Sequence, residues 1–113
     1  MRPKPVPLPE PTVHNSILRA IQKKQLIRFI YNGKERIGEP HDYGIQNGSV
    51  RLLTYQVGGK SSSGRLPAWR WMEVTRMSDL QVLEETFLGS RGESSSKHHA
   101  WDHIFARVGD SES

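Results

Sequence analysis

The stretch that decides the fold is residues 25–57, QLIRFIYNGKERIGEPHDYGIQNGSVRLLTYQV. Its first seven residues alternate their side chains with a period of two, which is typical of a β-strand and not of a helix. Asn32-Gly33 and Asn47-Gly48 are two-residue turn signals, because both residues of such a turn take a positive φ that asparagine and glycine tolerate best. Residues 25–57 therefore predict two consecutive β-hairpins.

The flanking sequence predicts one helix and further strands. Apolar residues recur at helical spacing from Val13 to Ile21, and Thr12 is a suitable N-cap, which predicts a helix at 12–24. Pro40 cannot donate a hydrogen bond to a sheet ladder, so we expect it to end the second strand. The expected strands are 25–31, 34–39, 43–46, 49–57, 66–74, 80–83 and 100–108.

A helix leading into short strands joined by tight turns predicts a mainly β fold, a small closed barrel of five to six strands. Closure is favoured because it removes the exposed edges of a small sheet. Residues 1–11 hold five of the seven prolines and are expected to form a flexible, polyproline-like leader. Residues 12–108 are expected to form a single domain, and residues 109–113 a disordered tail.

Composition limits the class of protein. The 113 residues suit one domain with a modest core, and the absence of cysteine excludes disulfides and thiolate-bound zinc. No apolar run is long enough to span a bilayer or to act as a secretory signal, so we expect a cytoplasmic chain with no membrane partner.

The charge of the chain is uneven. Its net charge is +4, but Val13–Arg76 carries eleven lysines and arginines against four acids. A basic body favours an anionic partner such as nucleic acid. The alternative is that these side chains only keep a small barrel in solution.

The order of the residues resembles the WYL domain family over residues 16–88. The runs that carry the resemblance are ILRAIQKKQLIRFIYNG (17–33), RIGEPH (36–41), NGSVRLLTYQ (47–56) and WRWMEVTRMSDLQVLEETF (69–87). The chain departs from the family at Val50-Arg51-Leu52, where only the leucine of the Trp-Tyr-Leu motif remains. It departs again at Met72, which stands in place of an aspartate.

The resemblance implies a short N-terminal helix packed on an Sm-like β-barrel. It also implies a bacterial regulator that senses a ligand, or an accessory module that binds single strands. The chain has no room for a helix-turn-helix, so it is similar to a free-standing version of the domain. Arginines of the family form a positively charged pocket that reads phosphates, and this role carries over to Arg36 and Arg70.

The candidate site is a basic face with aromatic neighbours. Arginine suits it because the planar guanidinium binds two phosphate oxygens at once, and aromatic rings stack on bases. The alternative is that the rings are core, which we expect for Phe29 and Trp71. Lys60 and Arg65 flank a loop that either closes over an anion or is a plain surface linker. The candidate ligand-binding residues are Arg36, His41, Tyr43, Arg51, Tyr55, Lys60, Arg65, Trp69 and Arg70.

Two further motifs do not support catalysis. The run Val57–Ser61 suggests a phosphate loop, but Thr54 stands where the first glycine is required, and no helix is expected to follow. Two imidazoles and a carboxylate can hold a divalent ion, but this cluster follows a serine-rich loop, and we expect no metal. No paired acid and base is specified, so we expect no catalytic residue and no cofactor. The cluster consists of His98, His99, Asp102 and His103.

The sequence therefore predicts a non-enzymatic module that binds nucleic acid or a nucleotide-like anion in a regulatory or accessory role. The alternative is a protein–protein interaction module that uses exposed aromatic residues and a sheet edge. Salt dependence separates the two, because phosphate binding releases counterions and an apolar interface does not.

Overall fold

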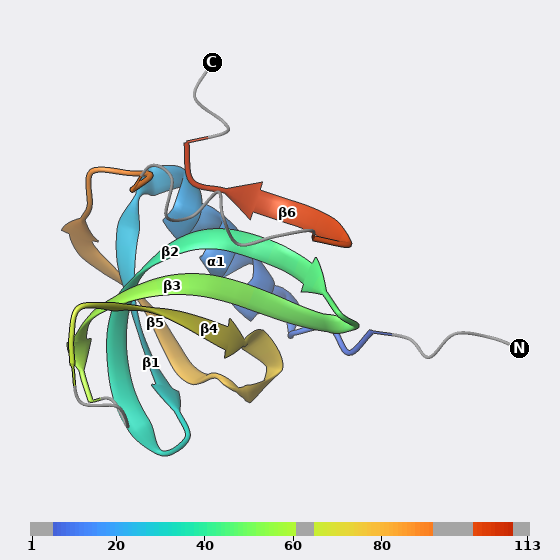
Figure 1. The fold of residues 1–113 in the computed structure, drawn as a ribbon, viewed down its shortest axis with the longest axis horizontal. Coiled ribbons are helices and arrows are strands. Elements are labelled where there is room, and N and C mark those ends of the chain that lie inside the picture. Colours follow the sequence, from blue (N-terminus) through green and yellow to red (C-terminus); the bar gives the residue numbers. More distant parts are fainter. Residues whose placement is uncertain (1–5, 61–64, 92–100, 110–113) are drawn as a thin grey trace, which may run out of the picture.

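The computed structural model describes residues 6–60, 65–91 and 101–109. Within these ranges the chain forms one α-helix, six β-strands and a 3-10 turn (Figure 1). The mainly β fold with one N-terminal helix is confirmed. The elements are α1 (Pro11–Lys23), β1 (Gln25–Tyr31), β2 (Lys34–Gln46), β3 (Ser49–Gly59), β4 (Ala68–Glu73), η1 (Val74–Arg76), β5 (Ser78–Thr86) and β6 (His103–Arg107).

All six strands belong to one antiparallel sheet. Its order is β4-β3-β2-β1-β5, with β6 added beside β2. One edge of β2 pairs with β3, and its other edge pairs first with β1, over Lys34–Gly38, and then with β6, over Asp42–Ile45. The order ends at β4 and β5, which do not pair within the described residues. The sheet is therefore open, and the predicted closed barrel is not confirmed.

Strand β2 runs through Pro40, where the sequence predicts a strand end. Pairing with β1 stops at Gly38 and pairing with β6 begins at Asp42, so Pro40 lies where this edge of β2 changes neighbours. A register shift between Pro40 and Asp42 marks a bulge against β3. Proline is tolerated at a bulge or an unpaired edge because no ladder hydrogen bond is lost there. The prediction of two strands at 34–39 and 43–46 is wrong, and they form one.

Helix α1 begins at Pro11, so the expected cap at Thr12 is wrong. Proline is favoured in the first turn because its fixed φ suits a helix and its missing N–H would have no partner there. Glu10 occupies the cap position and makes no side-chain capping bond. The buried stripe of the helix consists of Ile17, Ala20 and Ile21.

The core lies between α1 and one face of the sheet, here called the inner face. Phe29 is fully buried on this face, as predicted. Trp71 was expected in the core, and this is wrong, because it is half-buried on the outer face with its ring centroid 5.4 Å from that of Trp101. Strand neighbours alternate faces, and Met72, next to Trp71, is the core residue. The sheet residues of the core are Ile27, Phe29, Tyr31, Tyr43, Val50, Leu52 and Met72.

The last two strands differ in extent from their predictions. The strand expected at 80–83 is longer in the structure, where β5 runs from Ser78 to Thr86. The strand expected at 100–108 is shorter, because only His103–Arg107 form β6, and residue 100 lies outside the described ranges. Val6, in the expected leader, packs against the core. Residues 1–5 and 110–113 lie outside the described ranges.

Candidate anion-binding site

Two arginines from different strands share the inner face of the sheet. Arg36 on β2 pairs with the core residue Phe29, and Arg70 on β4 pairs with Thr54. Thr54 alternates with Leu52, which is also a core residue. Because directly paired residues project to the same face, both arginines project to the inner face.

Arg36 is almost completely enclosed, with 5% of its surface exposed. Its Nη1 donates to Oε1 of Gln56 at 3.4 Å, and its guanidinium carbon lies 5.5 Å from the ring centroid of Tyr31. Gln56 is itself held in place, because its Nε2 donates to the backbone carbonyls of Gly58 and Lys60 at 3.0 and 2.9 Å. Nε of Arg36 has no hydrogen-bond partner among the described residues. The buried guanidinium therefore keeps an unused donor.

The charges of the two arginines act on each other. Burial lowers the pKa of Arg36 and the charge of Arg70 lowers it further, whereas Tyr31 acts in the opposite direction. No carboxylate of the described residues takes part in this balance. Two like charges on a partly desolvated face are unfavourable, and an anion bound between them would relieve the repulsion. A phosphate suits this arrangement because each guanidinium can bind two of its oxygens.

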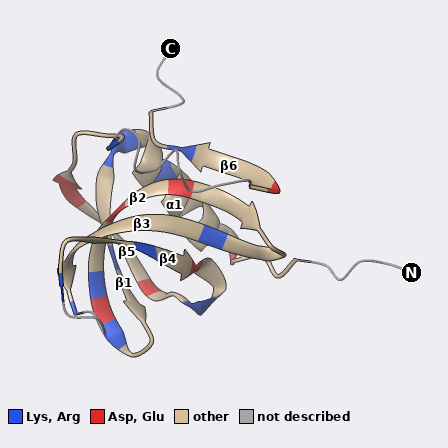
Figure 2. Ribbon diagram, viewed as in Figure 1, with Lys and Arg blue, Asp and Glu red and all other residues tan. Residues whose placement is uncertain are grey.

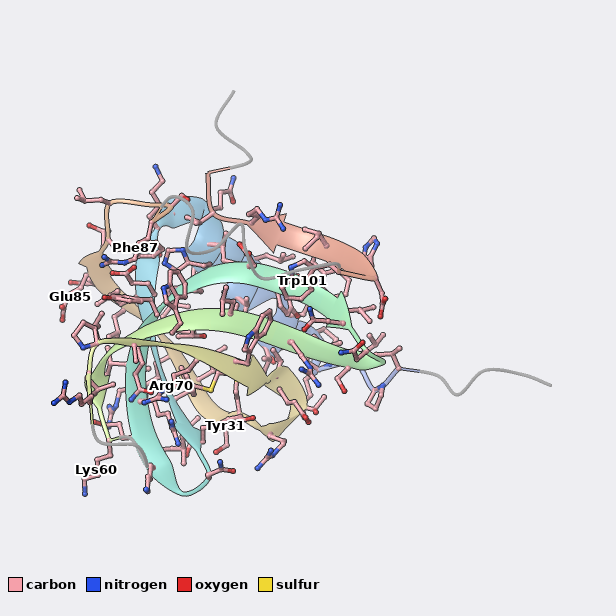
Figure 3. All side chains as sticks on the ribbon, viewed as in Figure 1. Tyr31, Lys60, Arg70, Glu85, Phe87 and Trp101 are labelled. Carbon is pink, nitrogen blue, oxygen red and sulfur yellow. The ribbon has the colours of Figure 1, made fainter. Side chains whose placement is uncertain are left out.

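Lys60 extends the positive charge to the rim of the same region. Its backbone N–H donates to the carbonyl of Glu35 at 2.7 Å, beside Arg36, and its side chain is exposed. Figure 3 shows Lys60, Arg70 and Tyr31 in the same part of the molecule. The first half of β2 carries two basic residues with an acidic residue between them (Figure 2). We define Arg36 and Arg70 as the basic inner-face site, with Lys60 at its rim.

The candidate aromatic residues do not join this site. Tyr55 and Trp69 pair with each other across β3 and β4 on the outer face. His41 is fully buried, with its ring centroid 4.8 Å from that of Trp69. Tyr43 is fully buried in the core, where burial raises its pKa and its hydroxyl bonds Nδ1 of His14 at 2.7 Å. The rings predicted to stack on bases therefore lie on the opposite face of the sheet or in the core.

Two predicted basic residues also lie apart from the pair. Arg51 pairs with Glu73 across β3 and β4, in phase with Tyr55 on the outer face, and is half-buried. Arg65 is exposed, and residues 61–64, which separate it from Lys60, lie outside the described ranges. Of the nine predicted residues, the structure therefore brings together Arg36 and Arg70, and it places the backbone of Lys60 beside Arg36.

The outer face carries a charged cluster that the sequence did not predict. Glu39, 4% exposed, accepts two hydrogen bonds from Arg91, at 2.8 Å from Nε and 2.7 Å from Nη2. Nε2 of His41 donates to Oε1 of Glu39 at 3.0 Å. Arg91 was missed because it stands in a glycine- and serine-rich segment that reads as a loose loop. The only signal was Glu39 itself, one of the four acids in the basic stretch Val13–Arg76.

The members of this cluster tune one another's protonation. Burial alone would raise the pKa of Glu39, but the hydrogen bonds from Arg91 and His41 outweigh it and hold the pKa below its ordinary value. Burial lowers the pKa of His41 by more than the bond to Glu39 raises it. The hydrogen bond to Glu39 raises the pKa of Arg91. The folded cluster therefore holds one carboxylate, one guanidinium and a neutral imidazole.

Acid is expected to destabilise the fold through His41. Below its ordinary pKa of 6.5 the unfolded chain takes up a proton there that the folded chain does not, so the free energy of unfolding falls as the pH decreases. Glu39 adds to the loss below 4.5. His41→Gln, which keeps a donor toward Glu39, is expected to flatten the decline of the free energy of unfolding below pH 6.5, as measured by urea denaturation. His103→Gln also removes one imidazole, at an exposed position on β6, and serves as the control. An equal flattening in both variants would contradict the assignment.

Within the described ranges, the remaining motifs add no second site. No group of three or more metal-ligating side chains occurs in the described part of the chain, and His98 and His99 of the predicted cluster lie outside it. Oδ2 of Asp102 accepts the backbone N–H of Asn47 at 2.9 Å. No helix in the described ranges is long and apolar enough to cross a membrane.

Comparison of the chain with protein-family profiles, curated proteins and solved structures found no match.

Proposed function

We propose that this protein binds nucleic acid or a nucleotide-like anion through the basic inner-face site and catalyses no reaction on it. The observation that carries the proposal is Arg36. It is buried, it has an unused Nε donor, and it faces the like charge of Arg70. A buried guanidinium beside a second positive charge is costly for folding alone, and a bound phosphate would add a negative charge next to Arg36.

The proposal includes membership of the WYL-like class of regulatory or accessory modules with an Sm-like sheet. A helix followed by five strands in the order β4-β3-β2-β1-β5, with β4 and β5 joined through η1, fits the arrangement that the resemblance implies. Arg36 and Arg70 are the residues that the resemblance assigns to phosphate recognition, and both lie on the inner face. The proposal also places the protein in the cytoplasm, a reducing compartment that suits a chain without cysteine.

A second candidate is a protein-interaction module. It is favoured by the open sheet, because β4 and β5 end the strand order and each has one edge without a described strand neighbour. Such edges offer backbone groups to an added strand. Binding of this kind would depend on backbone pairing and not on Arg36.

Salt dependence is the test of the proposed function. We expect a fluorescein-labelled single strand, titrated by anisotropy, to bind less tightly as salt rises. Two phosphate contacts predict a slope of log K against log salt of about −1.4, or about a sevenfold loss over a fourfold rise in salt. Duplex DNA and RNA of the same sequence identify the preferred polymer. Free nucleotides, used as competitors, distinguish a polymer from a small ligand. Absence of binding to all of them at low salt would overturn the proposal and favour the protein-interaction module.

A further inference from the structure

The contact between Arg91 and Glu39 has the geometry of a recognition site for guanidinium. The two hydrogen bonds, of 2.8 and 2.7 Å, join two nitrogens of the guanidinium to the two carboxylate oxygens. The guanidinium carbon also lies 4.0 Å from the ring centroid of Tyr55. A bidentate carboxylate and an aromatic face are the two features that select a planar guanidinium over an ammonium group.

The receiving half of this contact is built into the sheet. Glu39, Tyr55 and Trp69 are directly paired across β2, β3 and β4, so they form one row on the outer face. The ring centroids of Tyr55 and Trp69 lie 5.0 Å apart, and His41 holds Glu39 from the buried side. These residues keep their places through strand pairing, independently of Arg91. We call this row the outer-face receptor.

The guanidinium half comes from outside the regular structure. Arg91 follows β5 in a segment without helix or strand, and 43% of its side chain is exposed, against 5% for Glu39. A cleft of about 490 Å³ opens beside the ion pair and is lined by Glu39, Arg91, Phe87 and Val57 among others. Phe87 lies in a different part of the molecule from Arg70 and Lys60 (Figure 3). A ligand can therefore approach the carboxylate from solvent, away from the basic inner-face site.

We propose that the outer-face receptor is a binding site for arginine-type guanidinium groups, which the chain's own Arg91 fills in the absence of a ligand. When Arg91 withdraws, the site accepts the guanidinium of an arginine-bearing peptide or of a small arginine derivative. The exchange conserves the ion pair, the bidentate hydrogen bonds and the ring contact. Arg91 is thereby released from the outer face. This site lies on the opposite face from the basic inner-face site and does not depend on the proposed function.

Chemical replacement in the Arg91→Ala variant tests this proposal. The variant leaves Glu39 enclosed without its cationic partner, so we expect a lower thermal midpoint than in the parent. N-acetyl-arginine amide, added at concentrations up to about tenfold above its Kd, should raise that midpoint by about 5–10 °C. N-acetyl-lysine amide and sodium chloride at equal ionic strength should not. If the variant is unfolded in buffer, adding the arginine derivative should restore the spectrum of the folded protein, and this result would support the proposal equally.

Two variants and a pair of peptides complete the test. Glu39→Gln combined with Arg91→Ala removes the carboxylate, and its midpoint should not respond to the arginine derivative. Arg91→Lys keeps the positive charge but lacks the planar guanidinium. Its midpoint should still rise with the arginine derivative, because the added guanidinium contacts Glu39 and Tyr55 better than the lysine ammonium does. Capped Gly-Arg-Gly and Gly-Lys-Gly show whether the site takes a side chain within a peptide or only the small derivative. Equal responses to arginine and lysine compounds, or a response without Glu39, would overturn the proposal.

Discussion

Replacing Arg36 by alanine is expected to weaken oligonucleotide binding about ten- to hundred-fold at fixed salt. The substitution removes charge-assisted hydrogen bonds to phosphate, which contribute about 1.5–3 kcal/mol. Arg70→Ala should cause a loss of similar size, because the two side chains lie on one face and act on each other's charge. The measurement is an anisotropy titration of the parent and both variants against the same labelled single strand.

A matched control separates local recognition from general attraction. Lys23→Ala removes an exposed positive charge from α1 and should change affinity by much less, since a distant surface charge contributes only long-range attraction. Arg36→Met keeps most of the side-chain volume and removes the buried charge. It should leave the stability unchanged or higher while binding is lost, because apolar replacement of buried charges is often neutral or stabilising. If Arg36→Ala and Arg70→Ala both fold and bind the oligonucleotide as well as the parent does, the two arginines are structural.

Gly44→Ala is expected to destabilise the fold by about 1–3 kcal/mol, the usual cost of overpacking. A Cβ at this position would lie 2.2 Å from the carbonyl oxygen of His103 and 3.0 Å from the ring of Trp101. Both neighbours belong to the segment that carries β6, so relief of the clash requires β6 to move away from β2. Urea denaturation measures the loss, and the tryptophan emission reports displacement of Trp101 from Trp71.

Gly58→Ala is the matched control for this prediction. A Cβ at Gly58 would lie 3.5 Å from the nearest atom, on the side chain of Ile37, which is ordinary van der Waals contact. The same substitution in a neighbouring strand should therefore change the free energy of unfolding far less. Similar losses at both positions would mean that the cost comes from the glycine backbone and not from the close approach of β6.

The local chemistry of the chain was sufficient to predict the first part of the fold. Asn32, Gly33, Asn47 and Gly48 all have positive φ, as the two hairpin turns require, and the strands on either side pair antiparallel as expected. These elements depend on residues close in sequence. The pairing of β6 with β2 depends on residues far apart, and no local pattern specifies it. The open edges at β4 and β5 are likewise a property of the whole sheet.

The candidate site was predicted only in part, because the prediction did not follow the alternation of side chains along each strand. Trp69 and Arg70 are adjacent on β4, so they must project to opposite faces and cannot belong to one surface. The sequence contained this information. The position of His41 did not follow from alternation, because the bulge between Pro40 and Asp42 changes the phase of β2. Nor could any pattern show that Arg91 returns to Glu39.

One edge of β2 pairs first with β1 and then with β6, and this affects the order in which the chain assembles. Two-residue turns connect β1, β2 and β3, so these strands can meet within microseconds and with little loss of chain entropy. Pairing of β6 with β2 requires two segments that are far apart in the sequence to meet, so this step is slower than formation of the hairpins. During synthesis on the ribosome, the Asp42–Ile45 edge of β2 is therefore translated long before its partner exists. Until β6 emerges, a nascent chain exposes that edge to aggregation, and this is the stage at which a chaperone would be of most use.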